Sequence, residues 1–157
     1  MYSPRQVLAR SVRLSLPDPT LPPFAPAHVA GAERALGRTL PRAFVSFAQA
    51  LAGRSVPGVD VFRLAPEVDE LRNLVEVNLR WRSPRHGCGL PADLIAFAPD
   101  GAGDLFCFDL RGGSDDPPVV LWDPMLDAEQ NLADLDPHFG SFVEWLEAEL
   151  NLVTAAA

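Results

Sequence analysis

Apolar residues recur at helical spacing in two stretches near the start of the chain, and each stretch opens with a proline and closes with a glycine. The first runs from Pro26 to Leu36 before Gly37, and the second opens at Pro41 and stops at Gly53. Proline is favoured at the first helical position and glycine just past the last. Apolar residues of the second stretch stand three, four and seven positions after the first of them: Phe44, Phe47, Ala48 and Leu51. The pattern predicts two helices joined as a compact hairpin.

Two further helices are predicted later in the chain. One opens at Pro66 and runs to about Arg82, with acids in its first turn (Glu67, Asp69 and Glu70) and Arg80 and Arg82 in its last, a polarity that complements the helix dipole. The other covers about 138–150 and carries an apolar stripe. The stripe consists of Phe139, Phe142, Val143, Leu146 and Leu150. We expect the residues after 152 to form a weakly ordered tail.

Strand patterns fill the region between these helices. The segment V-D-V-F-R-L at 59–64 alternates, and three short apolar runs at 94–98, 105–110 and 119–122 are rich in branched and aromatic residues. The order predicts an α+β fold: a mostly antiparallel central sheet, helices packed at one side, and a C-terminal amphipathic helix. Five prolines in 17–28 indicate that residues 1–23 are an extended, proline-rich segment before a single domain.

The segment F-A-P-D-G-A-G-D-L-F, starting at Phe97, suggests either an ion site or a hairpin. A calcium loop beginning at Asp100 lacks the glycine and the final acid that such a loop needs, because Leu105 and Arg111 occupy those positions. A phosphate cradle would lead into a helix and would not be flanked by acids. We therefore predict a β-hairpin turn. Asp109 in the second strand is expected either at a solvent-facing edge or as a buried acceptor of backbone amides.

The distribution of charge along the chain says more about possible partners than the overall composition does. The net charge is −8, but residues 1–85 hold twelve of the thirteen basic residues against seven acids, whereas residues 86–157 hold Arg111 alone against fourteen acids. An acidic half repels phosphate backbones, so we expect no nucleic-acid partner. Such a surface suits a basic protein partner, although acids also simply keep a protein soluble.

The sequence contains few residues in patterns typical of catalysis or metal binding. No nucleotide or nucleophile motif is present, the three histidines are scattered, and His86 and Cys88 have no second Cys/His pair at zinc spacing. We expect no metal and no cofactor. Cys107 is predicted to be a small buried hydrophobic residue and Cys88 a loop thiol. Two cysteines, no signal-peptide pattern and no apolar run approaching ~20 residues indicate a cytoplasmic protein without a membrane partner.

Four segments, in order, resemble the SUKH superfamily. They are A-E-R-A-L-G-R-T-L-P-R-A-F (32–44), the hairpin segment from 94 to 110, P-P-V-V-L-W-D (117–123) and F-G-S-F-V-E-W-L (139–146). The resemblance implies a single domain over residues 24–152. The sequence departs from the family pattern at Ala52-Gly53-Arg54, where the family often has an Asn-Gly pair. Its first twenty residues match no part of that pattern. The superfamily offers no catalytic residues to carry over.

The resemblance implies a non-catalytic protein that binds and neutralises a bacterial toxin, often a nuclease or deaminase. An inhibitor of such an enzyme gains by mimicking phosphate charge, so acids in or near loops on the sheet side are the candidate contacts: Asp100, Asp104, Asp115, Asp116, Asp123 and Asp127. A regulatory or scaffold module without a toxin is the alternative, and an enzyme using an acid cluster in a deep pocket is a third possibility. The oligomeric state is left open.

Overall fold

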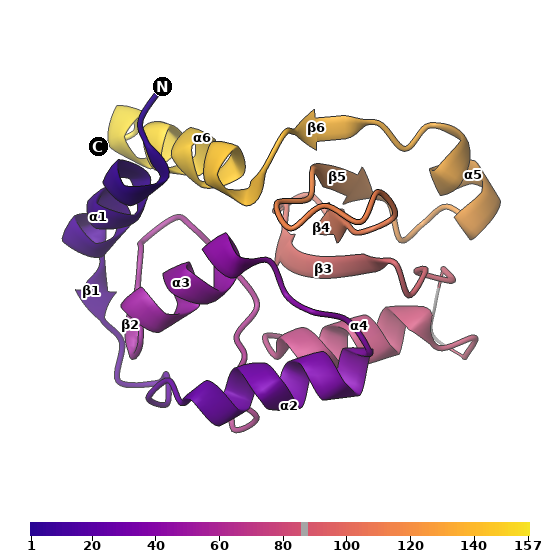
Figure 1. The fold of residues 1–157 in the computed structure, drawn as a ribbon, viewed down its shortest axis with the longest axis horizontal. Coiled ribbons are helices and arrows are strands. Elements are labelled where there is room, and N and C mark those ends of the chain that lie inside the picture. The colour runs from indigo at the N-terminus through magenta and orange to yellow at the C-terminus, as the bar shows by residue number, and fades with distance from the viewer. Residues whose placement is uncertain (86–87) are drawn as a thin grey trace.

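The computed structural model describes residues 1–85 and 88–157, and its element order is the predicted α+β arrangement (Figure 1). Over these residues the helices are α1 (Pro4–Leu14), α2 (Pro26–Leu36), α3 (Arg42–Ala50), α4 (Leu74–Arg82), α5 (Ala128–Ala133) and α6 (Phe142–Ala155). A four-stranded antiparallel sheet has the order β3 (Leu94–Pro99), β4 (Leu105–Asp109), β5 (Val119–Trp122) and β6 (Pro137–Phe139). The short strands β1 (Leu16–Pro17) and β2 (Arg54–Ser55) pair separately.

The two predicted helices and the predicted sheet hairpin are confirmed, but α2 and α3 do not form a compact helical hairpin: α2 packs mainly against α4, and α3 against α1 and α6. Gly37 ends α2 in the left-handed conformation, with a φ of 69°. In the β3–β4 turn Gly101 and Gly103 have φ values of 86° and 112°, which other residues rarely adopt. The Asp100 carboxylate accepts hydrogen bonds from the backbone amides of Ala102 and Asp104, at 2.7 and 2.9 Å. The turn chemistry therefore serves the fold.

The core is an aromatic cluster that joins α3, the sheet and α6. The ring centroid of Phe44 lies 5.4 Å from those of both Phe108 and Phe142, and Phe97 stacks on Phe108 at 4.2 Å. Trp145 meets Phe97 edge-on at 4.9 Å. All five side chains are buried, and edge-to-face and offset contacts of this kind add to the free energy gained by burial.

The outer edge of β3 is closed by a side chain instead of another strand. Asn78 of α4 is fully buried, accepts a hydrogen bond from the Ala96 amide and donates one to the Ala96 carbonyl, both at 2.8 Å. The prediction of a strand at 59–64 is therefore wrong. The Phe62 amide donates a hydrogen bond to the Phe97 carbonyl, and Arg63 forms an isolated bridge with Asn73, but these contacts do not make a continuous ladder. The edge that such a ladder needs is already occupied.

The third predicted helix begins eight residues later than expected, at Leu74. Asn73 caps it by accepting a hydrogen bond from the Glu76 amide and donates one to the Ala65 carbonyl. Asp69 closes a turn by accepting a bond from the Leu71 amide. Such local side-chain bonds compete with helix formation. The acids at 67–70 therefore lie outside the helix, while the two predicted arginines do occupy its last turn.

The two ends of the chain correct two further predictions. Residues 4–14, expected to be extended, form α1, which Ser3 and Gln6 begin with a capping box and Pro4 at the first position. The expected tail instead continues α6 to Ala155. Arg10 of α1 donates hydrogen bonds to the Leu150 carbonyl and to the side chains of Asn151 and Thr154 there. Figure 1 shows α1 and α6 side by side.

The last helix also begins later than predicted, because residues 137–139 pair with β5 as strand β6. Ser141 then caps α6 by accepting a hydrogen bond from the Glu144 amide. The helix α5 was not predicted. It is capped by Asp127, whose carboxylate accepts a bond of 2.8 Å from the Gln130 amide.

Candidate protein-binding surface

The six predicted contact residues lie at opposite ends of the sheet. Leu105 pairs with Trp122 across β4 and β5, so Asp104 and Asp123, the residues next to them, are neighbours. Asp100 lies in the turn that precedes Asp104, and Asp127 follows Asp123 by four residues. Asp115 and Asp116 lie in the β4–β5 loop, beyond the other end of both strands. The structure thus brings four of the six acids to one end and separates the other two.

The carboxylates of Asp100 and Asp123 lie close enough to Asp104 to affect its charge. Partial burial, followed by the negative charges of Asp123 and Asp100, raises the pKa of Asp104 above its usual value. Among the described residues, neither ion pair involves this group: Arg38 pairs with Asp93, and Arg111 with Asp109. These carboxylates therefore concentrate negative potential that no described cation neutralises.

Three of these acids also have local structural roles. Asp100 holds the hairpin turn, and Asp127 caps α5. The Asp123 carboxylate accepts a hydrogen bond from the Met125 amide at 2.8 Å, while the Asp123 amide donates to the side chain of Asn131. Asp104 is different, because no described donor bonds to its carboxylate. Its charge is the one least explained by the fold.

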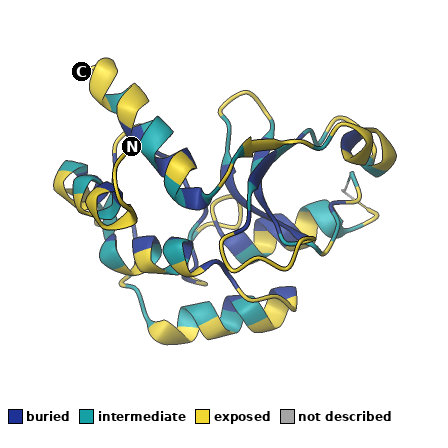
Figure 2. Ribbon diagram, turned by 45° about the horizontal axis from the view of Figure 1, so that its top comes forward, coloured by how far each residue is buried: buried dark blue, intermediate teal, exposed yellow. Residues whose placement is uncertain are grey.

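Exposed apolar side chains lie beside these acids. Met125 is 91% exposed, and Leu126 and Leu132 are 38% and 41% exposed. Figure 2 shows α5 as a largely exposed helix at one end of the molecule. We call the surface formed by these three residues with Asp100, Asp104, Asp123 and Asp127 the acidic end. The sequence did not predict its apolar part, although the acid Asp127 three residues before Gln130 was an available capping signal.

Asp109 was predicted to lie either at a solvent-facing edge or as a buried hydrogen-bond acceptor, and the structure shows the buried acceptor. Its carboxylate accepts bonds from the backbone amide and the guanidinium of Arg111, at 2.8 to 3.1 Å. These hydrogen bonds lower the pKa of Asp109 below its ordinary value. A paired carboxylate of this kind belongs to the fold and is not available to a partner.

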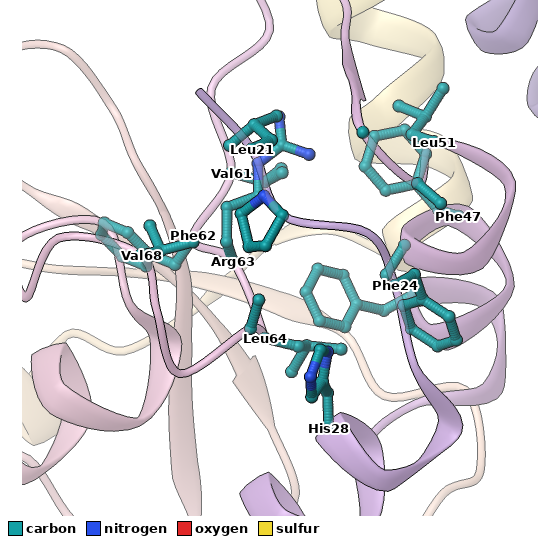
Figure 3. A pocket seen from close by; sticks show the side chains of 16 residues that line it. Leu21, Phe24, His28, Phe47, Leu51, Val61, Phe62, Arg63, Leu64 and Val68 are labelled. Carbon is teal, nitrogen blue, oxygen red and sulfur yellow. The ribbon is translucent and has the colours of Figure 1, made fainter. Parts of the chain in front are cut away.

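A small cavity between α2, α3 and residues 61–68 is too small for a substrate (Figure 3). Its volume is about 40 Å³, and aliphatic and aromatic side chains such as Leu21, Phe24 and Leu64 crowd it. Its polar lining includes His28 and Arg63, with no carboxylate. Burial and the nearby Arg72 lower the pKa of Arg63. Space on this scale accommodates water molecules at most.

The cysteines are placed as predicted. Cys107 is buried in β4, and burial raises the pKa of its thiol far above the ordinary value. Cys88 is partly buried and accepts a hydrogen bond from the Trp122 indole. His86, the other half of the weighed metal pair, lies outside the described residues. In the described ranges no three His, Cys, Asp or Glu side chains gather as metal ligands.

No helix within residues 1–85 or 88–157 combines the length and the apolar character needed to cross a bilayer.

An antiparallel sheet with helices packed around it defines the fold class as α+β. Residues 27–143 match the SUKH_6 family (SMI1-KNR4 cell-wall), and the chain belongs to that family. It is a family that includes immunity proteins and is generally non-catalytic. The matched region runs from α2 to the start of α6, so α1 precedes it. A search of curated proteins found no match.

Proposed function

We propose that this chain is a cytoplasmic immunity protein that neutralises a bacterial toxin of the nuclease or deaminase class by binding it through the acidic end. The observation that carries the proposal is the gathering of Asp100, Asp104 and Asp123 at one end of the sheet, where no described cation pairs with them. A toxin that binds nucleic acid presents a basic surface, and carboxylates in this arrangement compete with phosphates for it.

The exposed apolar residues support the same surface. Met125 and Leu132 would lose exposed area to a partner, whereas the acids around them would orient the encounter. Family membership supports a protein partner, because the family includes immunity proteins.

The test begins with the product of the neighbouring gene, co-expressed with this chain and assayed for co-purification and rescue of growth. We expect the double variant D104N/D123N to weaken binding by about tenfold, equivalent to ~1.4 kcal/mol. D115N/D116N is the matched control, since it removes the same charge at the opposite end of the sheet. Wild-type affinity should also fall as salt rises, because the screening length shrinks to ~8 Å at physiological ionic strength.

A complex that is insensitive to both salt and D104N/D123N would contradict binding through the acidic end. A locus with no toxin gene, together with a partner that is not toxic, would favour the alternative of a regulatory or scaffold module. The family description, which refers to the cell wall, is the observation behind that alternative.

A further inference from the structure

A groove on another part of the molecule has the size and composition of a binding site. Its volume is about 1050 Å³, and it lies between α1, α2, α3 with the α2–α3 connection, α6 and the β4–β5 loop. Leu8, Val45 and Val143 are partly exposed along it. Ligand sites typically span ~300–1000 Å³ and are largely apolar. The groove therefore has room for several side chains of a peptide.

Charges of both signs border this apolar surface. Arg5 of α1 and Arg42 of α3 are exposed lining residues, and the β4–β5 loop contributes Asp115 and Asp116. The half-buried Glu33 of α2 also lines the groove. Among the described residues none of these five takes part in an ion pair, whereas Arg38, which also lines the groove, pairs with Asp93.

No ion pair among the described residues joins these arginines to these aspartates across the groove. Partial burial and the negative charge of Glu144 raise the pKa of Asp116, and no arginine contributes to lowering it. The groove therefore presents charges of both signs, from different elements, beside apolar surface.

One wall of the groove lies outside the region that matches the family. The helix α1 ends at Leu14, before the match begins at residue 27. Val7 is buried against the core, and the bonds from Arg10 to α6 hold the helix in place. The groove is thus a fixed feature of the fold of this chain.

We propose that this groove binds a peptide segment of another protein that carries an acidic and a basic residue on either side of an apolar side chain. The acidic residue would face Arg5 and Arg42, the basic one Asp115 and Asp116, and the apolar one the surface around Val45. A uniformly basic segment would be repelled by the arginines, and a phosphate backbone by the aspartates. The site is separate from the acidic end and does not depend on the toxin proposal.

The test uses random 12-residue peptides displayed on phage and selected against the full chain. Ser46 is an exposed groove residue of α3, so S46W fills the groove, while Q49W places the same side chain on an exposed position of α3 outside it. We expect enriched peptides to carry both charges around an apolar residue. They should lose at least about tenfold in affinity for S46W and for R42E, and bind Q49W and D104N/D123N as they bind the wild type.

Three results would overturn the proposal: no enriched peptide, enriched peptides that bind S46W as tightly as the wild type, or enriched peptides that are uniformly basic. The last result would assign peptide binding to the acidic end instead. Circular dichroism and urea unfolding of S46W and Q49W establish that both variants are folded before affinities are compared.

Discussion

Two aspartates of strand β4 and its flanks illustrate opposite uses of a carboxylate. Asp109 accepts hydrogen bonds from Arg111, which lower its pKa, so its ionised form stabilises the fold. Asp104 is partly desolvated beside Asp123 and Asp100, which raises its pKa, so its ionised form opposes folding. A carboxylate that the fold leaves without a hydrogen-bond donor is a candidate contact for a binding partner.

We predict that D104N melts at a slightly higher temperature than the wild type at pH 7. The raised folded-state pKa means that ionised Asp104 destabilises the folded protein at neutral pH, and that protonation relieves this as the pH falls through that pKa toward the usual 3.8. The difference in melting temperature should therefore shrink on acidification. Thermal unfolding followed by circular dichroism from pH 7 to about pH 4 measures it.

The variant D109N provides a control of opposite sign. The stability that Asp109 contributes is present above its unfolded pKa and is lost as the pH falls through its lowered folded-state pKa. D109N should therefore be less stable than the wild type at pH 7, with a gap that narrows in acid. If D104N also lost stability at pH 7, the view of Asp104 as a charge unused by the fold would be wrong.

At the scale of elements, side-chain caps and contacts between helices decide where each helix begins and ends. Asn73, Asp127 and Ser141 each accept a hydrogen bond from a free amide in the first turn of a helix. The far end of α6 has no basic residue in its last turn, and its position depends on α1. Arg10 supplies three hydrogen bonds to that end.

We predict that R10A loosens the last turn of α6 and lowers the free energy of unfolding by about 1 kcal/mol. The physical reason is that the carbonyl of Leu150 and the side chains of Asn151 and Thr154 lose their donor. Hydrogen exchange should accelerate at the backbone amides of residues 153–155. R13A is the matched control, because no described hydrogen bond involves the Arg13 side chain, and equal exchange in both variants would contradict the prediction.

At the scale of the whole molecule, one aromatic cluster ties three layers together. Phe44 of α3 contacts Phe97 and Phe108 of the sheet and Phe142 of α6. The helices that line the groove and the strands that carry the acidic end therefore rest on the same packed rings. A substitution that disrupts the packing of these rings should therefore affect both the groove and the acidic end.

We predict that F44A lowers the free energy of unfolding by about 3–5 kcal/mol, because it leaves a cavity among buried rings. F24A removes the same atoms from a partly exposed position at the edge of the small cavity and should cost distinctly less. Urea unfolding of the three proteins compares them. Equal losses from F44A and F24A would show that the core is not organised around Phe44.

Charge is also distributed on the scale of the molecule. Residues 1–85, which form α1 to α4, carry twelve of the thirteen arginines, and the sheet with α5 and α6 carries most of the acids. Such separation orients an approaching charged partner before contact. It is consistent with the proposed basic partner at the acidic end, and it places Arg5, Arg38 and Arg42 at the groove.

Local patterns in the sequence predicted the elements that local chemistry controls. Proline and glycine mark the bounds of α2, the glycines and aspartates of 100–104 make the β3–β4 turn, and apolar runs make β3, β4 and β5. The capping box at Ser3 was equally local and could have predicted α1. These signals act within a few residues, so sequence alone carries them.

The sequence by itself therefore determined the α+β class, the β3–β4 hairpin and the family to which the chain belongs. Tertiary structure decided the rest: Asn78 closes β3 and leaves 59–64 without a ladder, and Arg10 extends α6 into the expected tail. It also decided which acids meet, placing Asp104 beside Asp123 and removing Asp115 and Asp116 to the groove. Strand register and helix docking bring together residues far apart in the chain, and spacing along a sequence does not encode those distances.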